Sequence, residues 1–328
     1  MSGHILVAGG AGYVGSHIVH ALADKGRGVV VLDDFSTGEP GLVPEGVPVV
    51  AGDISDTDLV TSTIDKYECE AVYHFAAKIA VAESVAQPLA YYWSNVAKTI
   101  ALLKACDQAN VGRFIFSSSA AVYDGSKTRP LSETDSIGPS SPYGRTKRMV
   151  EELLLDLANV SAMRVGILRY FNVAGADPQL RTGQVGKVAT HLIKRASQAA
   201  LGILPHIDVF GTDYDTPDGT AVRDYIHATD LATVHLLFLE HMANATDHRV
   251  LNCGYGRGFS VSEVLDMVDD VVGKSIKRII APRRSGDPAS LVANSDLARQ
   301  VLGWEPAYDD LRVIVETALG WERKRFHR

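Results

Sequence analysis

The chain has 328 residues, of which 46% are hydrophobic and 22% charged, and this composition excludes collagen-like, disordered and disulfide-scaffold proteins. Its 32 basic and 39 acidic residues give a net charge of −7, which disfavours binding to a nucleic-acid backbone. The length allows about two domains, each large enough to bury a core.

Short runs rich in Val, Ile and Phe alternate with helical patterns in the first half, which is typical of βαβ units in a parallel sheet. We predict strands at 4–8, 28–32, 47–51, 71–75, 113–117 and 164–170, and helices at roughly 13–25, 88–110 and 142–159. In the second half, strands are predicted at 207–210, 250–253 and 275–280, with long loops at 174–186 and 211–220.

These elements predict an α/β fold. A Rossmann-type doubly wound parallel sheet is expected in residues 1–172, with some later segments returning to it, and a smaller C-terminal α/β domain for substrate in 173–328. The N-terminal apolar run is too short for a signal peptide, and no stretch approaches the ~18 apolar residues of a membrane span. We therefore expect a cytoplasmic protein with neither nucleic-acid nor membrane partners.

The cysteines and histidines predict no metal site. Cys69, Cys106 and Cys253 form no CxxC pair, so neither a disulfide framework nor a thiolate zinc site is indicated. The eleven histidines show no HExxH spacing.

A glycine-rich turn joins the first predicted strand to the first helix. Gly9, Gly12 and Gly15 have the spacing that lets a backbone approach a pyrophosphate at a helix N-terminus. The pair Asp33-Asp34 ends the next strand, 18 residues after Gly15. A carboxylate there accepts a hydrogen bond from a ribose 2′-hydroxyl and repels a 2′-phosphate, so NAD is predicted in preference to NADP.

Asp53 ends the third predicted strand and has two interpretations. It is a candidate contact to the adenine of the dinucleotide, or a solvated aspartate in a loop. The sequence leaves both open.

A tyrosine and a lysine four positions apart lie on one face of the helix predicted at 142–159. Tyr143 and Lys147 follow Ser119 by 24 and 28 residues, and Ser119 lies at the end of a strand whose carboxyl end faces the ligand crevice in this fold. A phenol with a pKa near 10 is a poor base at pH 7, and a neighbouring ammonium together with the positive nicotinamide ring of NAD favours the phenolate and lowers that pKa. We predict Tyr143 as the base, Lys147 as its electrostatic partner and Ser119 as a proton relay or a substrate contact.

With these motifs together, the chain resembles the UDP-glucose 4-epimerase family of the extended short-chain dehydrogenase/reductase superfamily. The resemblance runs from residue 4 to the region of Trp304, and its C-terminal stretches separate this family from its superfamily relatives. The stretches that carry the resemblance are His74-Phe-Ala-Ala77, Ser141-Pro-Tyr-Gly144, Leu168-Arg-Tyr-Phe-Asn172, Gly219-Thr-Ala-Val-Arg-Asp-Tyr-Ile-His227 and Ala281-Pro-Arg-Arg-Ser-Gly-Asp287. It implies interconversion of UDP-glucose and UDP-galactose by oxidation at C4, rotation of the 4-keto sugar and re-reduction, in a homodimer.

The resemblance also implies two sets of binding residues beyond the glycines, the aspartates and the Ser–Tyr–Lys group. NAD would be bound by Tyr13, Val14, Phe35, Ser36, Ile54, Phe75, Ala76, Ala77, Lys78, Asn95, Ser117 and Phe171. The UDP-sugar would be bound by Asn172, His191, Leu192, Val209, Phe210, Arg223, Arg284, Asp287 and Leu291. Within the second set, Arg223 and Arg284 would hold the diphosphate, Phe210 the uracil and Asp287 the ribose.

Some positions depart from the family pattern. The contact of Lys78 is open by one residue, Ser94 stands where some members have Asn, and His191 replaces an amide that meets the sugar. We align Leu291 with the residue beside the sugar's 2-position, with Ser290 as the alternative. A UDP-glucuronate or UDP-pentose 4-epimerase and a non-catalytic NAD-binding module are the rival interpretations. A 4,6-dehydratase is disfavoured, because Ala120 and Ala121 stand where it needs an acid pair.

Overall fold

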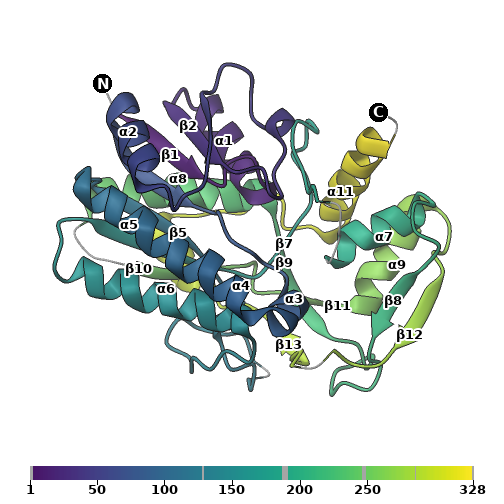
Figure 1. Ribbon diagram of the computed structural model, residues 1–328. Helices are drawn as coiled ribbons and strands as arrows, with labels where there is room; N and C mark the ends of the chain where they lie inside the picture. Colours follow the sequence, from purple (N-terminus) through teal and green to yellow (C-terminus); the bar gives the residue numbers. More distant parts are fainter. Residues whose placement is uncertain (1–2, 128, 187–190, 246–248, 285, 327–328) are drawn as a thin grey trace.

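The computed structural model describes residues 3–127, 129–186, 191–245, 249–284 and 286–326. Its larger part is a seven-stranded sheet in the order β10-β6-β5-β4-β1-β2-β3, shown in Figure 1. Every neighbouring pair in this sheet is parallel, which confirms the predicted Rossmann-type fold. The strands are β1 (His4–Ala8), β2 (Val29–Asp33), β3 (Val49–Ala51), β4 (Cys69–His74), β5 (Arg113–Ser119), β6 (Arg164–Tyr170) and β10 (Arg249–Cys253).

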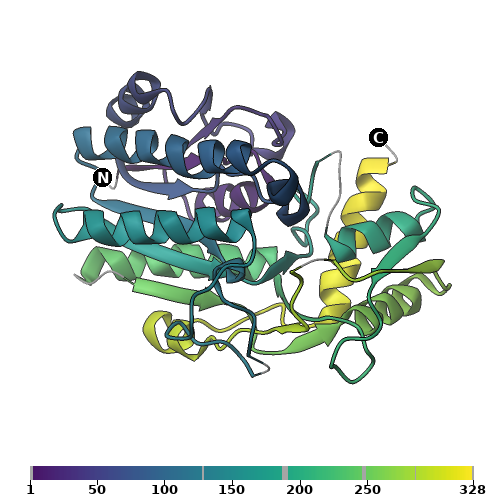
Figure 2. The same cartoon turned by 60° about the horizontal axis from the view of Figure 1, so that its bottom comes forward.

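Helices cover both faces of the sheet, which explains why its strands are nearly continuous apolar runs. Ile5 and Val7 of β1 pack in the cluster that includes α1 (Tyr13–Asp24) and α8 (Ala228–Asn244). Leu6 and Ala8 alternate with them and pack in the cluster of α2 (Thr57–Tyr67), α5 (Lys98–Gln108) and α6 (Pro142–Ala158). The helical layers are seen from a second direction in Figure 2.

The helix predicted at 88–110 is not continuous. It consists of α4 (Pro88–Tyr92), a π-helical turn at Trp93–Ala97 and α5, and it is preceded by α3 (Val81–Ala86). Single π-helical turns inside longer helices occur often at functional sites. This one carries Asn95.

The second lobe lies beside the carboxyl edge of the large sheet, at the right of Figure 1. Its strand β9 (Val222–His227) pairs with β7 (Asn172–Ala174), β11 (Gly258–Ser260) and β13 (Ser290–Leu291), and β8 (Ile207–Phe210) pairs with β12 (Arg278–Ala281). Its helices are α7 (Leu192–Ala200), α9 (Val261–Val272) and α11 (Leu311–Phe326), whereas α10 (Asp296–Leu302) packs against α8 and β10 of the larger part. The described part of the chain also contains short 3₁₀ helices at Pro40–Leu42 and Ala120–Val122.

The chain passes between the lobes more than once. After β7, α7, β8 and β9 it returns to the large sheet as α8 and β10, and β10 pairs with β6. Among the described residues, no helix has the length and apolarity that crossing a membrane requires.

Candidate active site

The glycine-rich turn has the geometry of a phosphate-binding loop. Gly9 has a φ of 81°, in the left-handed region that favours glycine. A Cβ on Gly15 would lie 2.2 Å from the carbonyl oxygen of Gly9, so only glycine lets α1 begin this close to the turn. Gly12 is the N-cap of α1 and has no side chain to cover the first N–H groups of the helix. An anion such as a pyrophosphate fits at this end of the helix dipole.

Asp33 connects β2 to this turn. Its two carboxylate oxygens accept hydrogen bonds from the backbone N–H groups of Ala11 (2.9 Å) and Phe35 (2.8 Å). Burial raises its pKa, and the two N–H donors partly offset that rise. Asp34 is exposed and accepts hydrogen bonds from the backbone and hydroxyl of Ser36. Asp33 therefore holds the glycine-rich turn through the N–H of Ala11, and it lies at the end of β2 where the cofactor ribose was predicted.

Asp53 has a partner that the sequence did not indicate. It forms a close ion pair with Lys98 at the start of α5, and it accepts hydrogen bonds from the backbone and hydroxyl of Ser55. The ammonium and both Ser55 donors lower its pKa, although burial opposes them. The adjacent Ile54 is buried in the core.

The loop after β4 is held by Asn95. The N–H groups of Phe75 and Ala76 both bond to the carbonyl oxygen of Ala8 in β1. The Asn95 side chain accepts a hydrogen bond from the N–H of Lys78 (2.8 Å) and donates one to its carbonyl (2.9 Å). Asn95 Nδ2 also donates to Thr146 Oγ1 on α6 (3.1 Å), so the π-helical turn links this loop to α6.

Ser119, Tyr143 and Lys147 meet at the carboxyl end of β5. Tyr143 is in the first turn of α6, which is capped by Ser141, and its hydroxyl contacts Ser119. Lys147 is one turn further along, and its Nζ donates to the carbonyl oxygen of Ser117 at 2.7 Å. The Lys147 ammonium lies 5.9 Å from the centre of the Tyr143 ring, so the three groups share one small region.

Burial governs the protonation of this group in the protein alone. It lowers the pKa of Lys147 to about 7, and the nearby Glu151 partly opposes that decrease. It raises the pKa of the Tyr143 phenol above 10, with the Ser119 contact opposing. The lowering of the Tyr143 pKa by Lys147 together with the nicotinamide ring of NAD stays a prediction.

Sequence reasoning missed a buried ion pair behind this group. Glu151 and Arg169 are almost fully buried, and the guanidinium binds both carboxylate oxygens, at 2.8 and 2.9 Å. Ser118 Oγ donates to Glu151 Oε1 at 2.5 Å. Glu151 falls on the same helix face as Tyr143 and Lys147, and a carboxylate on a buried face was the signal available in the sequence.

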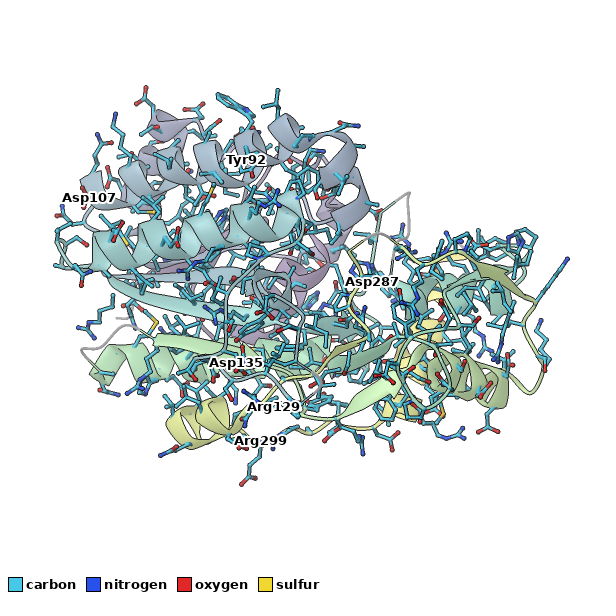
Figure 3. The ribbon with its side chains drawn as sticks, turned by 90° about the horizontal axis from the view of Figure 1, so that it is seen from below. Tyr92, Asp107, Arg129, Asp135, Asp287 and Arg299 are labelled. Atoms are coloured by element: carbon cyan, nitrogen blue, oxygen red, sulfur yellow. The ribbon has the colours of Figure 1, made fainter. Side chains whose placement is uncertain are left out.

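Several predicted substrate residues gather around β9 in the second lobe. Arg223 forms a close ion pair with Asp287, and Leu291 is paired with Arg223 in the register of β13 and β9. Figure 3 shows Asp287 between the two lobes. The Arg284 guanidinium lies over the ring of Phe210 at 3.9 Å. Two cationic side chains and an aromatic ring thus lie together, as a nucleotide diphosphate requires.

A cavity of about 20 Å³ lies beside β7, and three more of the predicted substrate residues, Asn172, His191 and Leu192, line it. Burial lowers the pKa of His191 to about 4, with the nearby Lys194 contributing, so this side chain is neutral at pH 7. The sequence did not indicate the buried ion pair in its wall, between Lys194 and Glu322 at 3.0 Å.

The remaining predicted residues have less specific environments. Val209 and Phe171 are buried in hydrophobic clusters, and Val14 packs against one. Tyr13 donates from its hydroxyl to the carbonyl oxygen of Gly175, which links α1 to the loop after β7. Ala77 is half-buried.

Comparison with known proteins identifies the family. Residues 5–254 match the NAD dependent epimerase/dehydratase family. The chain belongs to this family. It is 49% identical over 322 residues to a UDP-glucose 4-epimerase of Azospirillum brasilense, covering 98% of this chain and 92% of the relative.

Solved structures of related epimerases are also similar to this chain over almost its whole length. A UDP-glucose 4-epimerase from Brucella ovis in complex with NAD is 43% identical, with a TM-score of 0.94 over 97% of this chain and 98% of that one. One from Stenotrophomonas maltophila, with bound NAD and formylated UDP-arabinopyranose, is 37% identical, with a TM-score of 0.96 over 99% of both.

In the described part of the chain, no cluster of three or more His, Cys, Asp or Glu side chains could hold a metal ion.

Proposed function

We propose that this chain is an NAD-dependent 4-epimerase that interconverts UDP-glucose and UDP-galactose. The observation that carries the proposal is the meeting of Ser119, Tyr143 and Lys147 at the sheet edge beside the glycine turn. The similarity to UDP-glucose 4-epimerases extends over almost the whole chain, including the second lobe, and therefore supports the substrate as well as the fold.

The residues around the glycine turn fit NAD. The open N-terminus of α1 suits the pyrophosphate, and Asp33 and Asp34 lie at the end of β2, where a ribose 2′-hydroxyl would meet a carboxylate. We also assign to this site the backbone after β4 at Phe75, Ala76, Ala77 and Lys78, together with Ser36, Ile54, Asn95, Ser117 and Phe171. When bound, NAD supplies a reversible hydride acceptor, and the protein supplies orientation and electrostatics.

The proton steps are assigned to the Ser–Tyr–Lys group. Tyr143 takes the proton from the 4-hydroxyl of the sugar and later returns it, and Ser119 holds the same oxygen or relays the proton. Lys147 fixes the site through its bond to the Ser117 carbonyl, and its charge favours the phenolate as a cationic cofactor ring also would. Because the pKa of Lys147 is lowered to about 7, small changes in its surroundings near pH 7 change the fraction of Lys147 that is charged.

The second lobe would hold the nucleotide while the sugar turns. Arg223 and Arg284 are assigned to the diphosphate, Phe210 to the uracil and Asp287 to the ribose. Because Arg223 already pairs with Asp287, the two side chains hold each other in position. An anchored diphosphate lets the keto sugar present either face without leaving the site.

The test is conversion of UDP-galactose by the purified chain without added reductant. We expect UDP-glucose to accumulate until the two sugars reach equilibrium, and the Tyr143→Phe variant to turn over at least ~10²-fold more slowly, because a positioned proton-transfer group is lost. The variant removes only a hydroxyl, so its melting temperature serves as the control for folding. Absence of conversion, or near-normal turnover by the variant, would contradict the proposal.

We further propose that two copies associate through the face formed by α4, the π-helical turn, α5 and α6. Leu89 is 83% exposed and Trp93 64%, with Ile100 and Met149 also exposed on these helices. Figure 3 shows Tyr92 on this outer face. A cluster of large exposed apolar side chains is typical of a protein interface. Leu89→Asp should give a monomer in light scattering, whereas Val160→Asp, at an equally exposed valine after α6, should not.

The cellular location and the domain boundary are also proposals. Cys69, Cys106 and Cys253 are buried free thiols, of the kind that a reducing compartment preserves, and we propose a cytoplasmic location. We propose a division near residue 172, with α8 and β10 assigned to the cofactor domain because they pack on its sheet.

A further inference from the structure

The end of strand β5 has three consecutive serines that each contact a different turn of α6. The Ser117 carbonyl accepts the hydrogen bond of Lys147, the Ser118 hydroxyl donates to Glu151, and the Ser119 hydroxyl contacts Tyr143. The three partners on the helix are at positions i, i+4 and i+8, which lie on one face. Strand and helix are thus joined at three points, of which Glu151 is the innermost.

Glu151 is the most strongly held of the three. Its side chain has 0% exposure, and besides Ser118 it is bound by both Nε and Nη2 of Arg169. Arg169 continues to the hydroxyl of Tyr123 (3.0 Å), which in turn donates to Asn252 on β10 (2.7 Å). A fully hydrogen-bonded buried network of this kind holds its members rigidly.

We propose, on the basis of the epimerase function above, that Glu151 is a positioning residue for this reaction: through Ser118 it fixes how α6 lies against the end of β5, and it keeps a negative charge one turn from Lys147. The first effect sets the distance between Ser119 and Tyr143. The second keeps Lys147 in its ammonium form, against the cost of burial. Glu151 reaches neither substrate nor cofactor and acts only through these neighbours.

The other titratable groups around the site do not account for such an effect. They are His74 on β4, Tyr91 on α4, Arg148 on α6, and Arg169 and Tyr170 on β6. Burial lowers the pKa of His74 to about 3, so it stays neutral, and burial raises the pKa values of both tyrosines above 10. The two arginines stay charged. Lys147 is therefore the group whose charge changes near neutrality, and the Glu151 carboxylate favours its charged form.

Two variants separate the two effects. Ser118→Ala removes the hydroxyl between β5 and Glu151 and leaves every charge in place. We expect kcat for UDP-galactose to fall ~10-fold or more, since small displacements of reacting groups are costly, with KM and NAD affinity nearly unchanged. Glu151→Gln keeps an oxygen that accepts from Ser118 but removes the charge. We expect the alkaline limb of the kcat/KM profile to move down by about 1 pH unit or more.

The matched control is Ser197→Ala, at another fully buried serine, on α7 and outside this network. If Glu151→Gln does not fold because Arg169 loses its charged partner, the kinetics of Ser118→Ala alone test the positioning role of Glu151. Kinetic constants for Ser118→Ala equal to those of Ser197→Ala would overturn the proposal.

A second measurement does not depend on turnover. Ultraviolet titration, with the Tyr143→Phe spectrum subtracted, reports the pKa of the Tyr143 phenol. That pKa should rise in Ser118→Ala, because the Ser119 contact that lowers it is loosened. An unchanged phenol pKa would overturn the positioning role even if the unaltered chain proved inactive, whereas inactivity with a shifted pKa would count against the epimerase function alone.

Discussion

Replacing Lys147 with methionine should stabilise the protein while abolishing most of its activity. Burial lowers the pKa of this lysine from 10.5 to about 7, and one pKa unit corresponds to about 1.4 kcal/mol. Holding the ammonium in the folded state therefore costs up to about 5 kcal/mol. The variant loses the hydrogen bond to the Ser117 carbonyl, which offsets about 3 kcal/mol of that gain. A net gain of about 2 kcal/mol corresponds to a rise of ~3 °C in the melting temperature for a chain of this length.

The stabilisation of Lys147→Met should decrease as the pH rises. Below pH 7, Lys147 is charged in both the folded and the unfolded chain, so the whole penalty is present in the unaltered protein. As the pH rises from 7 towards 10.5, only the unfolded chain keeps the proton, and the penalty shrinks. The stabilisation in Lys147→Met is therefore greatest at or below neutrality and small near about pH 10.

Scanning calorimetry of both proteins without added cofactor, near pH 6.5 and about pH 9.5, measures this difference. The control is Lys194→Met, at another buried lysine, whose removal leaves Glu322 without its ion-pair partner and should destabilise by about 3–5 kcal/mol. A lower melting temperature for Lys147→Met near neutrality, or a gain that grows with pH, would refute the reasoning.

Three further outcomes are expected. Gly144→Ala should lower kcat by ~10²-fold, because its Cβ would lie 2.2 Å from the Ala121 carbonyl oxygen and α6 must move away from Ser119; unchanged kinetics would show that the helix position is not critical. NADP should bind the apo-protein more weakly than NAD in calorimetry, owing to the carboxylates that end β2, and equal affinities would contradict this. The kcat/KM for UDP-galactose should exceed that for UDP-N-acetylgalactosamine by roughly 10–200-fold if Leu291 limits room at the 2-position, and equal values would exclude Leu291 from that role.

Most of the sheet was predictable because its inner strands are buried on both faces. The expected strands at 4–8 and 164–170 coincide with β1 and β6, where apolar runs end at polar or glycine-rich loops. In the second lobe, the expected strand at 207–210 coincides with β8. The break in the helix at 88–110 was not predictable. A π-helical turn changes the hydrogen-bonding step by one residue and leaves the apolar pattern on either side readable as helix.

Some residues of the candidate site were likewise predictable from the sequence, and others were not. Tyr143 and Lys147 were recognisable because both lie on one helix, so their spacing is written in the sequence. The pair formed by Glu151 and Arg169 joins a helix to a strand, and the partner of Lys98 is Asp53, 45 residues away. Such pairings depend on how elements pack, which local patterns do not encode.

The return of the chain to the large sheet limits how the enzyme could be taken apart or rebuilt. β10 fills the edge of the sheet beside β6, and its Asn252 completes the polar network that reaches Arg169. A fragment ending near residue 172 would expose that edge and leave buried donors without acceptors. During synthesis, α6, which carries Tyr143 and Lys147, can therefore reach its final position against β5 only after β10 has left the ribosome. A chimera that exchanges substrate lobes must likewise be spliced at several points rather than one.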